Sequence, residues 1–243
     1  MSNPPTPAPA PKSRLGLTIA VLMIFMALGA VVWWNYYLKV KNDATKVRLP
    51  IKGKVETDPG YFVDRNNQPK KLEDLLGKVV VWSYVYTTCP QGCLGVAEKM
   101  KELQKEFGSN PKFQLVSVCL YPEFDRPERL NEWIKTAEFG GDNWWFLTTK
   151  GGAEADGEAM RKWMQKTFGI WAKKKDEEHL KEFPNDVWDH QLVMAVTDVH
   201  GNIRTPSDND SYWWVFHQAF DNSWAPRPIR EDIVKLLEEA EGK

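Results

Sequence analysis

The sequence predicts an α/β domain built on a mixed β-sheet, preceded by an N-terminal transmembrane helix. Strand-like runs of β-branched and aromatic residues alternate with amphipathic helical patterns from residue 79 onward. Near the C-terminus a tight turn at residues 198–202 returns the chain as a hairpin, which adds an antiparallel strand. Residues 15–38 form an apolar run that contains no charged side chain.

Composition limits the range of functions. The chain has 243 residues, enough for one good-sized domain with an added segment. A net charge of −1 gives no support to a nucleic-acid partner. Three cysteines are too few for a disulfide scaffold, but two of them are clustered, which indicates redox or metal chemistry.

The N-terminal region predicts a membrane anchor. Residues 1–14 begin with a Pro- and Ala-rich segment and are expected to form a disordered tail. As a helix, residues 15–38 would span about 36 Å, enough to cross a bilayer core of about 30 Å. The alternative is a cleaved signal peptide with a small-residue site at 27–30, but the run is long for a signal core and ends in an aromatic belt.

Orientation follows from the charges that flank this run. Lys12 and Arg14 favour a cytoplasmic N-terminus, although Lys39, Lys41 and two further basic residues compete on the other side. We expect a single-pass protein of the inner membrane with its large domain on the periplasmic side.

The remaining elements are expected in the following order. Residues 39–50 form a polar linker and residues 51–243 form the domain. Strands are expected at 61–65, 79–86, 113–119, 144–147, 192–197 and 203–204, and helical segments at 72–77, 94–107, 127–139, 153–168 and 229–240. A charged insertion from Lys173 to Trp188 is most simply a solvated loop.

Cys89 and Cys93 follow the strand at 79–86 and lie at the start of the helix at 94–107. This is where α/β sheets place their sites, and a helix N-terminus favours the thiolate. The i,i+4 spacing puts both sulfurs on one helix face, where they can chelate a soft ion such as Cu(I) or Zn(II), or close a disulfide. The alternative is that Cys89 and Cys93 are buried and unreactive. Pro90 and Gly92 argue against it because they expose the loop.

A dithiolate site leaves room for a histidine ligand, and the chain has four histidines. His179 lies in the charged insertion and His200 in a tight turn, and both positions have simpler explanations. His190 follows Asp189, which could orient the imidazole, and precedes the strand at 192–197. The residues favour His190 and leave His217 as the alternative.

The segment Thr87-Thr88-Cys89-Pro90-Gln91-Gly92-Cys93 resembles the signature of the Sco/SenC family. The resemblance runs from about Gly60 to the C-terminal helix, and further matches lie at 117–118, 122–123, 125–128 and 146–148. It implies a thioredoxin-like, membrane-anchored copper protein that helps to assemble the copper centre of cytochrome c oxidase. It also implies that the metal ligands are Cys89, Cys93 and His190.

The chain departs from the family pattern at three places. Leu94 stands where a proline usually follows the second cysteine, and Gln191 stands where serine is common. An apparent two-residue insertion brings Cys119 to the position of an aspartate. Cys119 could reach the site from its strand end, but a buried small side chain is the simpler interpretation.

The expected function is that of a metallochaperone. It would hold a copper ion, as Cu(I) with Cu(II) as a second state, and pass it to the copper-bearing oxidase subunit or to another copper chaperone. The alternative is a thiol–disulfide oxidoreductase that uses Cys89 and Cys93 to keep a client's cysteines reduced. A copper- or redox-sensing protein is a third hypothesis. Trp213, Trp214 and Trp224 form either a docking surface or part of the core.

Overall fold

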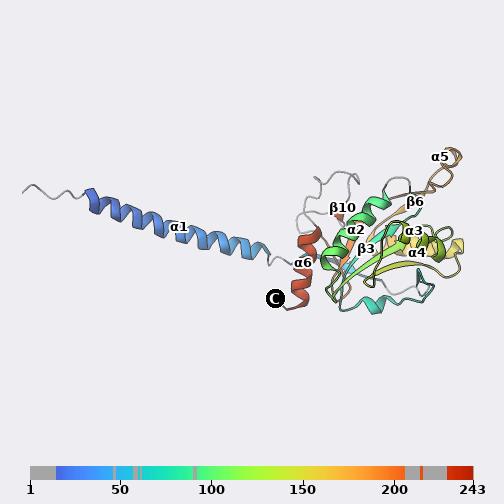
Figure 1. Cartoon of the computed structure of the whole chain (residues 1–243), viewed down its shortest axis with the longest axis horizontal. Coiled ribbons are helices and arrows are strands. Elements are labelled where there is room, and N and C mark those ends of the chain that lie inside the picture. Colours follow the sequence, from blue (N-terminus) through green and yellow to red (C-terminus); the bar gives the residue numbers. More distant parts are fainter. Residues whose placement is uncertain are drawn as a thin grey trace, which may run out of the picture. The chain divides into compact units, whose positions relative to one another are not determined.

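The computed structural model describes residues 15–45, 48–56, 60, 62–89, 92–205, 214–215 and 229–242. The chain forms two compact units, Met1–Val47 and Arg48–Lys243. Figure 1 shows a single long helix in the first unit and a helix-flanked sheet in the second.

The first unit contains helix α1, Leu15–Thr45. Within it, residues Ile19–Lys39 are long and apolar enough to cross a membrane, and this segment is a candidate membrane span. The helix continues through residues 39–45, where the sequence had indicated the start of a linker. The expected tail at 1–14 lies outside the described residues, and the predicted domain boundaries stay predictions.

The second unit is organised by a mixed sheet, which confirms the predicted fold class. Its strand order is β1-β9-β8-β3-β4-β5-β2, and β10 pairs with β8. Strands β3, β4 and β5 run parallel, whereas the other pairings are antiparallel. The bounds are β1 Ile51–Lys54, β2 Phe62–Asp64, β3 Val79–Val85, β4 Phe113–Cys119, β5 Trp144–Thr149, β8 Val193–Thr197, β9 Asn202–Arg204 and β10 Trp214–Val215.

Helices cover both faces of this sheet (Figure 1). Apolar residues of α2 (Cys93–Phe107), α3 (Pro127–Thr136) and α6 (Ile229–Ala240) form one core. Residues of α4 (Glu154–Phe168) and of the 3-10 helix Leu72–Leu75 form the other. Strand β3 supplies both cores because its side chains alternate, with Val81 and Val85 on one face and Trp82 and Tyr84 on the other.

The charged insertion is folded, so the expectation of a solvated loop at 173–188 was wrong. Strands β6 (Ala172–Lys174) and β7 (Trp188–His190) form a separate antiparallel pair, and helix α5 (Glu177–Glu182) lies between them. Charged side chains of the insertion pair with one another. Asp186 accepts a hydrogen bond from Lys175 at 2.5 Å and pairs with His179 at 2.9 Å. Asp176 caps α5 by accepting the N–H of His179.

Candidate metal centre

The sheet topology brings the cysteine segment and the histidine segment to one edge. Strand β8 is the antiparallel neighbour of β3, with Trp82 opposite Ala195. The carboxyl end of β3 therefore lies beside the amino end of β8. Cys89 and Cys93 follow the first end along the chain, and His190 lies three residues before the second.

The first turn of α2 holds the sulfur of Cys89. The backbone N–H groups of Gly92 and Cys93 point at Cys89 Sγ, at 3.3 and 3.4 Å. These are donors that a helix N-terminus leaves without intrahelical partners. Donors placed in this way stabilise the thiolate form of a cysteine, and the thiolate state of Cys89 stays a prediction.

Gly92 lets the cysteine loop approach the histidine segment closely. A Cβ atom at this position would lie 2.4 Å from Cδ2 of Leu192, well inside van der Waals contact. Leu192 is two residues after His190. A glycine between the two cysteines therefore allows the loop and the histidine segment to pack against each other.

His190 ends strand β7, where it pairs with Ala172 of β6. Its Nδ1 atom lies 3.2 Å from the backbone carbonyl of Gln191, which assigns the ring proton to Nδ1 and leaves the lone pair on Nε2. Asp189 was expected to orient this ring, but the Gln191 carbonyl holds that position. Asp189 is exposed, because adjacent residues on a strand point to opposite faces.

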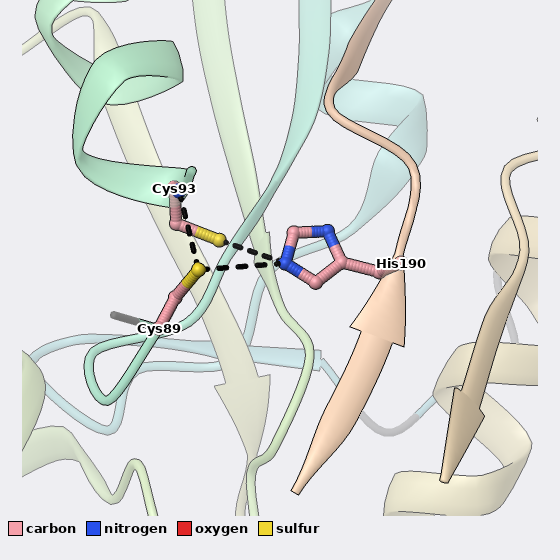
Figure 2. A group of neighbouring side chains, drawn as sticks. All are labelled: Cys89, Cys93 and His190. Carbon is pink, nitrogen blue, oxygen red and sulfur yellow. Dashed lines mark hydrogen bonds between the residues drawn. The ribbon is translucent and has the colours of Figure 1, made fainter. Parts of the chain in front are cut away.

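The three predicted ligand groups meet. His190 Nε2 lies 3.2 Å from Cys93 Sγ and 3.8 Å from Cys89 Sγ, and the three atoms all lie within 4.8 Å of one another. Figure 2 shows both sulfurs and the imidazole pointing toward a common centre, with Cys93 on the first turn of a helix and His190 at the tip of a strand. Cys89, Cys93 and Cys119 are reduced, and no disulfide joins them.

The surroundings of the three groups differ. Cys93 is buried, whereas Cys89 and His190 are partly exposed, so the group opens to solvent on one side. Burial raises the pKa of the Cys93 thiol well above its ordinary value, and the neighbouring Cys89 adds to this effect. Two sulfur ligands and an imidazole suit a soft ion such as Cu(I), or Zn(II).

A buried carboxylate supports the start of the cysteine loop. Asp125 is fully buried and accepts hydrogen bonds from the backbone N–H of Thr87, at 3.0 Å, and from the Thr87 hydroxyl. Arg129 pairs with Asp125 at 3.5 Å and donates to the Thr87 hydroxyl at 3.0 Å. The sequence marked residues 125–128 only as a segment that resembles the family. The structure shows that Asp125 supports the cysteine loop.

Arg161 was missed from the sequence, although it contacts the histidine strand. Its guanidinium forms a two-pronged pair with Glu123, at 2.9 and 3.3 Å, and lies 4.0 Å from the ring centroid of Trp188. Trp188 begins β7, two residues before His190. A lone arginine on a helical pattern carries no local signal for such a contact.

The other candidate residues lie elsewhere or outside the described residues. His179 pairs with Asp186, and His200 is exposed in the turn between β8 and β9. Cys119 is buried, with its sulfur 3.8 Å from the carbonyl of Asp125, and the metal-ligating group does not include it. Trp214 lies in β10. His217, Trp213 and Trp224 fall outside the described residues.

The fold and the site define a class: a thioredoxin-like protein with a two-cysteine, one-histidine candidate metal centre beside its sheet. A model of the SCO1/SenC family matches residues 53–211, and the chain belongs to this family.

Two curated relatives agree with this assignment. The SCO1 protein homolog of Bacillus subtilis (strain 168) is 28% identical over 107 residues, which cover 44% of this chain and 55% of that protein. The mitochondrial SCO2 homolog of Danio rerio is 25% identical over 142 residues, which cover 55% of this chain and 50% of that protein. The aligned region thus spans about half the length of these relatives.

Solved structures show the same fold. A SCO1/SenC family lipoprotein from Bacillus anthracis superposes with a TM-score of 0.60 at 23% identity, over 78% of this chain and 98% of that one. BsSco is described as a member of the Sco family of cytochrome c oxidase assembly proteins with a disulfide switch. It superposes with a TM-score of 0.52 at 23% identity, over 68% of this chain and 91% of that one. These likenesses confirm the thioredoxin-like architecture.

Proposed function

We propose that this chain is a membrane-anchored copper metallochaperone that binds copper through Cys89, Cys93 and His190. It would deliver the ion to the copper centre of a cytochrome c oxidase, or help to assemble that centre. The observation that carries the proposal is the convergence of His190 Nε2 and the two Sγ atoms within 4.8 Å. Membership of the SCO1/SenC family supports it, as does the description of BsSco as an oxidase assembly protein.

The donor set fits a soft cation. Two cysteine sulfurs favour Cu(I), and an imidazole nitrogen can serve as a third ligand for Cu(I) or stabilise Cu(II). The backbone carbonyl of Gln191 fixes the imidazole with Nε2 toward the sulfurs, which is how metal-binding histidines are oriented. The site therefore needs little rearrangement to receive an ion.

Partial exposure suits transfer of the ion. Cys89 and His190 reach the surface while Cys93 is buried beneath them, so a client's ligand can approach from one side. A three-coordinate ion keeps an open position, which lets an incoming thiolate or imidazole replace one protein ligand at a time. We propose the copper-bearing oxidase subunit, or another copper chaperone, as the partner.

The proposed membrane location of the chain rests on the helix of the first unit. The candidate span at Ile19–Lys39 would hold the chain in a membrane as a single-pass protein. We place the second unit on the periplasmic side of an inner membrane, where the copper centre of an oxidase would be accessible to it.

A thiol–disulfide oxidoreductase is the second candidate, and two neighbouring cysteines in the reduced form favour it. Cys89 thiolate would attack a client disulfide to form a mixed disulfide and release one client thiolate. Cys93 thiolate would then attack the Cys89 sulfur and release the second. The client gains two electrons, and this chain ends with a Cys89–Cys93 disulfide. This chemistry does not require the imidazole.

Competition titration tests the proposal. The full-length chain is purified in mild detergent, kept reduced, and titrated with Cu(I) against a chromogenic chelator. Loss of one ligand should weaken copper affinity by more than the roughly 10- to 100-fold that loss of a supporting hydrogen-bond partner costs. We expect such losses for Cys89→Ser, Cys93→Ser and His190→Ala. The matched controls are Cys119→Ala and His200→Ala, which remove the same residue types elsewhere.

The outcomes separate the two candidates. Weak binding by His190→Ala, with parental binding by His200→Ala, supports the metallochaperone. Undiminished copper affinity after Cys93→Ser or His190→Ala would remove the proposed ligand set. If the parent lacks copper affinity but reduces a model disulfide at the same rate with and without His190, the oxidoreductase is the better account.

A further inference from the structure

Tyr86 is the residue that contacts both halves of the candidate metal centre. It is the first residue after β3 and three residues before Cys89. Its backbone carbonyl accepts the N–H of Cys89 at 3.2 Å, and its ring packs edge-on against His190 with centroids 6.1 Å apart. One buried residue therefore contacts the cysteine loop through its backbone and the imidazole through its ring.

The hydroxyl of Tyr86 also binds the folded insertion. It donates to the backbone carbonyl of Asn185 at 2.8 Å and accepts the N–H of Val187 at 2.7 Å. Val187 directly precedes β7, the strand that carries His190, and Asn185 lies three residues before it.

These bonds matter because β7 does not belong to the main sheet. It pairs with β6 in a separate two-stranded sheet. Two-stranded pairs are marginally stable by themselves and take their position from contacts with the rest of the protein. The Tyr86 hydroxyl provides two such contacts within five residues of His190.

Tyr84 offers a matched comparison. It lies on the same strand face two residues earlier, is buried, and packs edge-on against His190 with centroids 6.3 Å apart. Its hydroxyl, however, has no hydrogen-bond partner among the described residues. The two tyrosines share their ring contact with the imidazole and differ in what the hydroxyl does.

We propose that Tyr86 is a positioning residue whose hydroxyl fastens the insertion to the cysteine loop and thereby sets the place of His190 relative to the two sulfurs. The inference rests on the proposed copper function. It assigns a role to the insertion, which positions the strand that carries the third ligand. The Tyr86 hydroxyl makes this connection, and the ring does not.

The test compares Tyr86→Phe with Tyr84→Phe in the full-length chain in detergent. Each variant keeps the ring and removes one hydroxyl. Loss of a hydrogen-bond partner that orients a metal ligand typically weakens metal affinity about 10- to 100-fold. We expect a Cu(I) loss in that range for Tyr86→Phe and parental affinity for Tyr84→Phe. The Cu(II) electron paramagnetic resonance spectrum of Tyr86→Phe should shift toward that of His190→Ala.

A metal-free measurement accompanies the titration. The Val187 amide donates to Tyr86, so its hydrogen exchange should be faster in Tyr86→Phe and unchanged in Tyr84→Phe. Two results would overturn the inference if His190→Ala still loses copper. One is unchanged hydrogen exchange at Val187 in Tyr86→Phe. The other is that Tyr86→Phe and Tyr84→Phe have equal copper affinity and equal spectra. If the parent and His190→Ala bind copper equally, the proposed function fails, and the inference fails with it.

Discussion

The Nε2 atom of His190 lies 3.2 Å from Sγ of Cys93, although 97 positions separate the two residues in the chain. The antiparallel pairing of β3 with β8 makes this contact, because it sets the end of one strand beside the start of the other. The carbonyl of Gln191 then turns the imidazole so that its lone pair faces the sulfur.

Copper affinity should fall as the pH falls. Burial raises the pKa of the Cys93 thiol, so Cys93 carries a proton at neutral pH in the metal-free chain and must release it when copper binds. One released proton corresponds to about a tenfold loss of affinity per unit of pH. Titrations at several pH values between about 6 and 8 measure the slope. An affinity that does not change over this range would contradict the assignment of Cys93 as a thiolate ligand.

Gly92→Ala should disturb the site through Leu192. The added Cβ would lie 2.4 Å from Cδ2 of Leu192, so the leucine must move. Overpacking of this kind costs about 1–3 kcal/mol, and we expect a lower free energy of unfolding together with weaker Cu(I) binding.

Two variants control this experiment. Gly53→Ala is the matched glycine change, because its Cβ would meet Ile203 only at 4.0 Å. Adding Leu192→Ala to Gly92→Ala removes the clashing side chain and should restore part of the affinity. A Gly92→Ala chain as stable and as tightly binding as the parent would show that the close approach does not matter.

Much of this architecture follows from local patterns in the sequence. The strand at 113–119 was predicted to the residue, and the strand that begins at residue 79 was predicted one residue too long, since buried parallel strands carry continuous β-branched runs. The two cysteines were placed correctly because a strand, a Pro- and Gly-containing turn and a helical pattern follow one another.

Other features could not be found in this way. The residues favoured His190 over His217, but only the family resemblance settled the choice, because the pairing of β3 with β8 has no local signal. The insertion was taken for a loop because its stability comes from the Asp186 cluster and from the Tyr86 hydroxyl, which joins residues 99 and 101 positions away. Contacts over such separations leave no periodic pattern.

Asp198 should stabilise the second unit independently of the metal centre. Its side chain and that of Arg204 are 6% and 4% exposed and pair at 2.9 Å. Burial by itself would raise the pKa of Asp198, but hydrogen bonds from Asn202 and Arg204 outweigh burial and leave the pKa below its usual value. The stabilisation is therefore present at neutral pH and is lost as the pH falls below about 4.

Chemical denaturation of Asp198→Ala measures this contribution. Removing one partner of a buried ion pair costs about 3–5 kcal/mol, and the second partner Glu239 should keep the loss near the lower end. Copper affinity below the unfolding transition should equal that of the parent. A variant as stable as the parent at pH 7 would contradict the role assigned to the pair.

Membrane topology can be measured with two reporters fused to the C-terminus of the chain in a bacterial host. Alkaline phosphatase is active outside the cytoplasm, whereas green fluorescent protein exported unfolded stays dark. We expect an active phosphatase fusion and a dark fluorescent fusion, both in the membrane fraction. The opposite pattern would place the second unit in the cytoplasm and contradict the proposed location.

X-ray absorption at the copper edge tests the central claim most directly. The full-length chain, loaded with one equivalent of Cu(I) in detergent, should show two sulfur scatterers and one nitrogen scatterer. The nitrogen should disappear in His190→Ala and remain in His200→Ala. A copper shell that keeps its nitrogen in His190→Ala, or that loses no sulfur in Cys93→Ser, would contradict the three-ligand site.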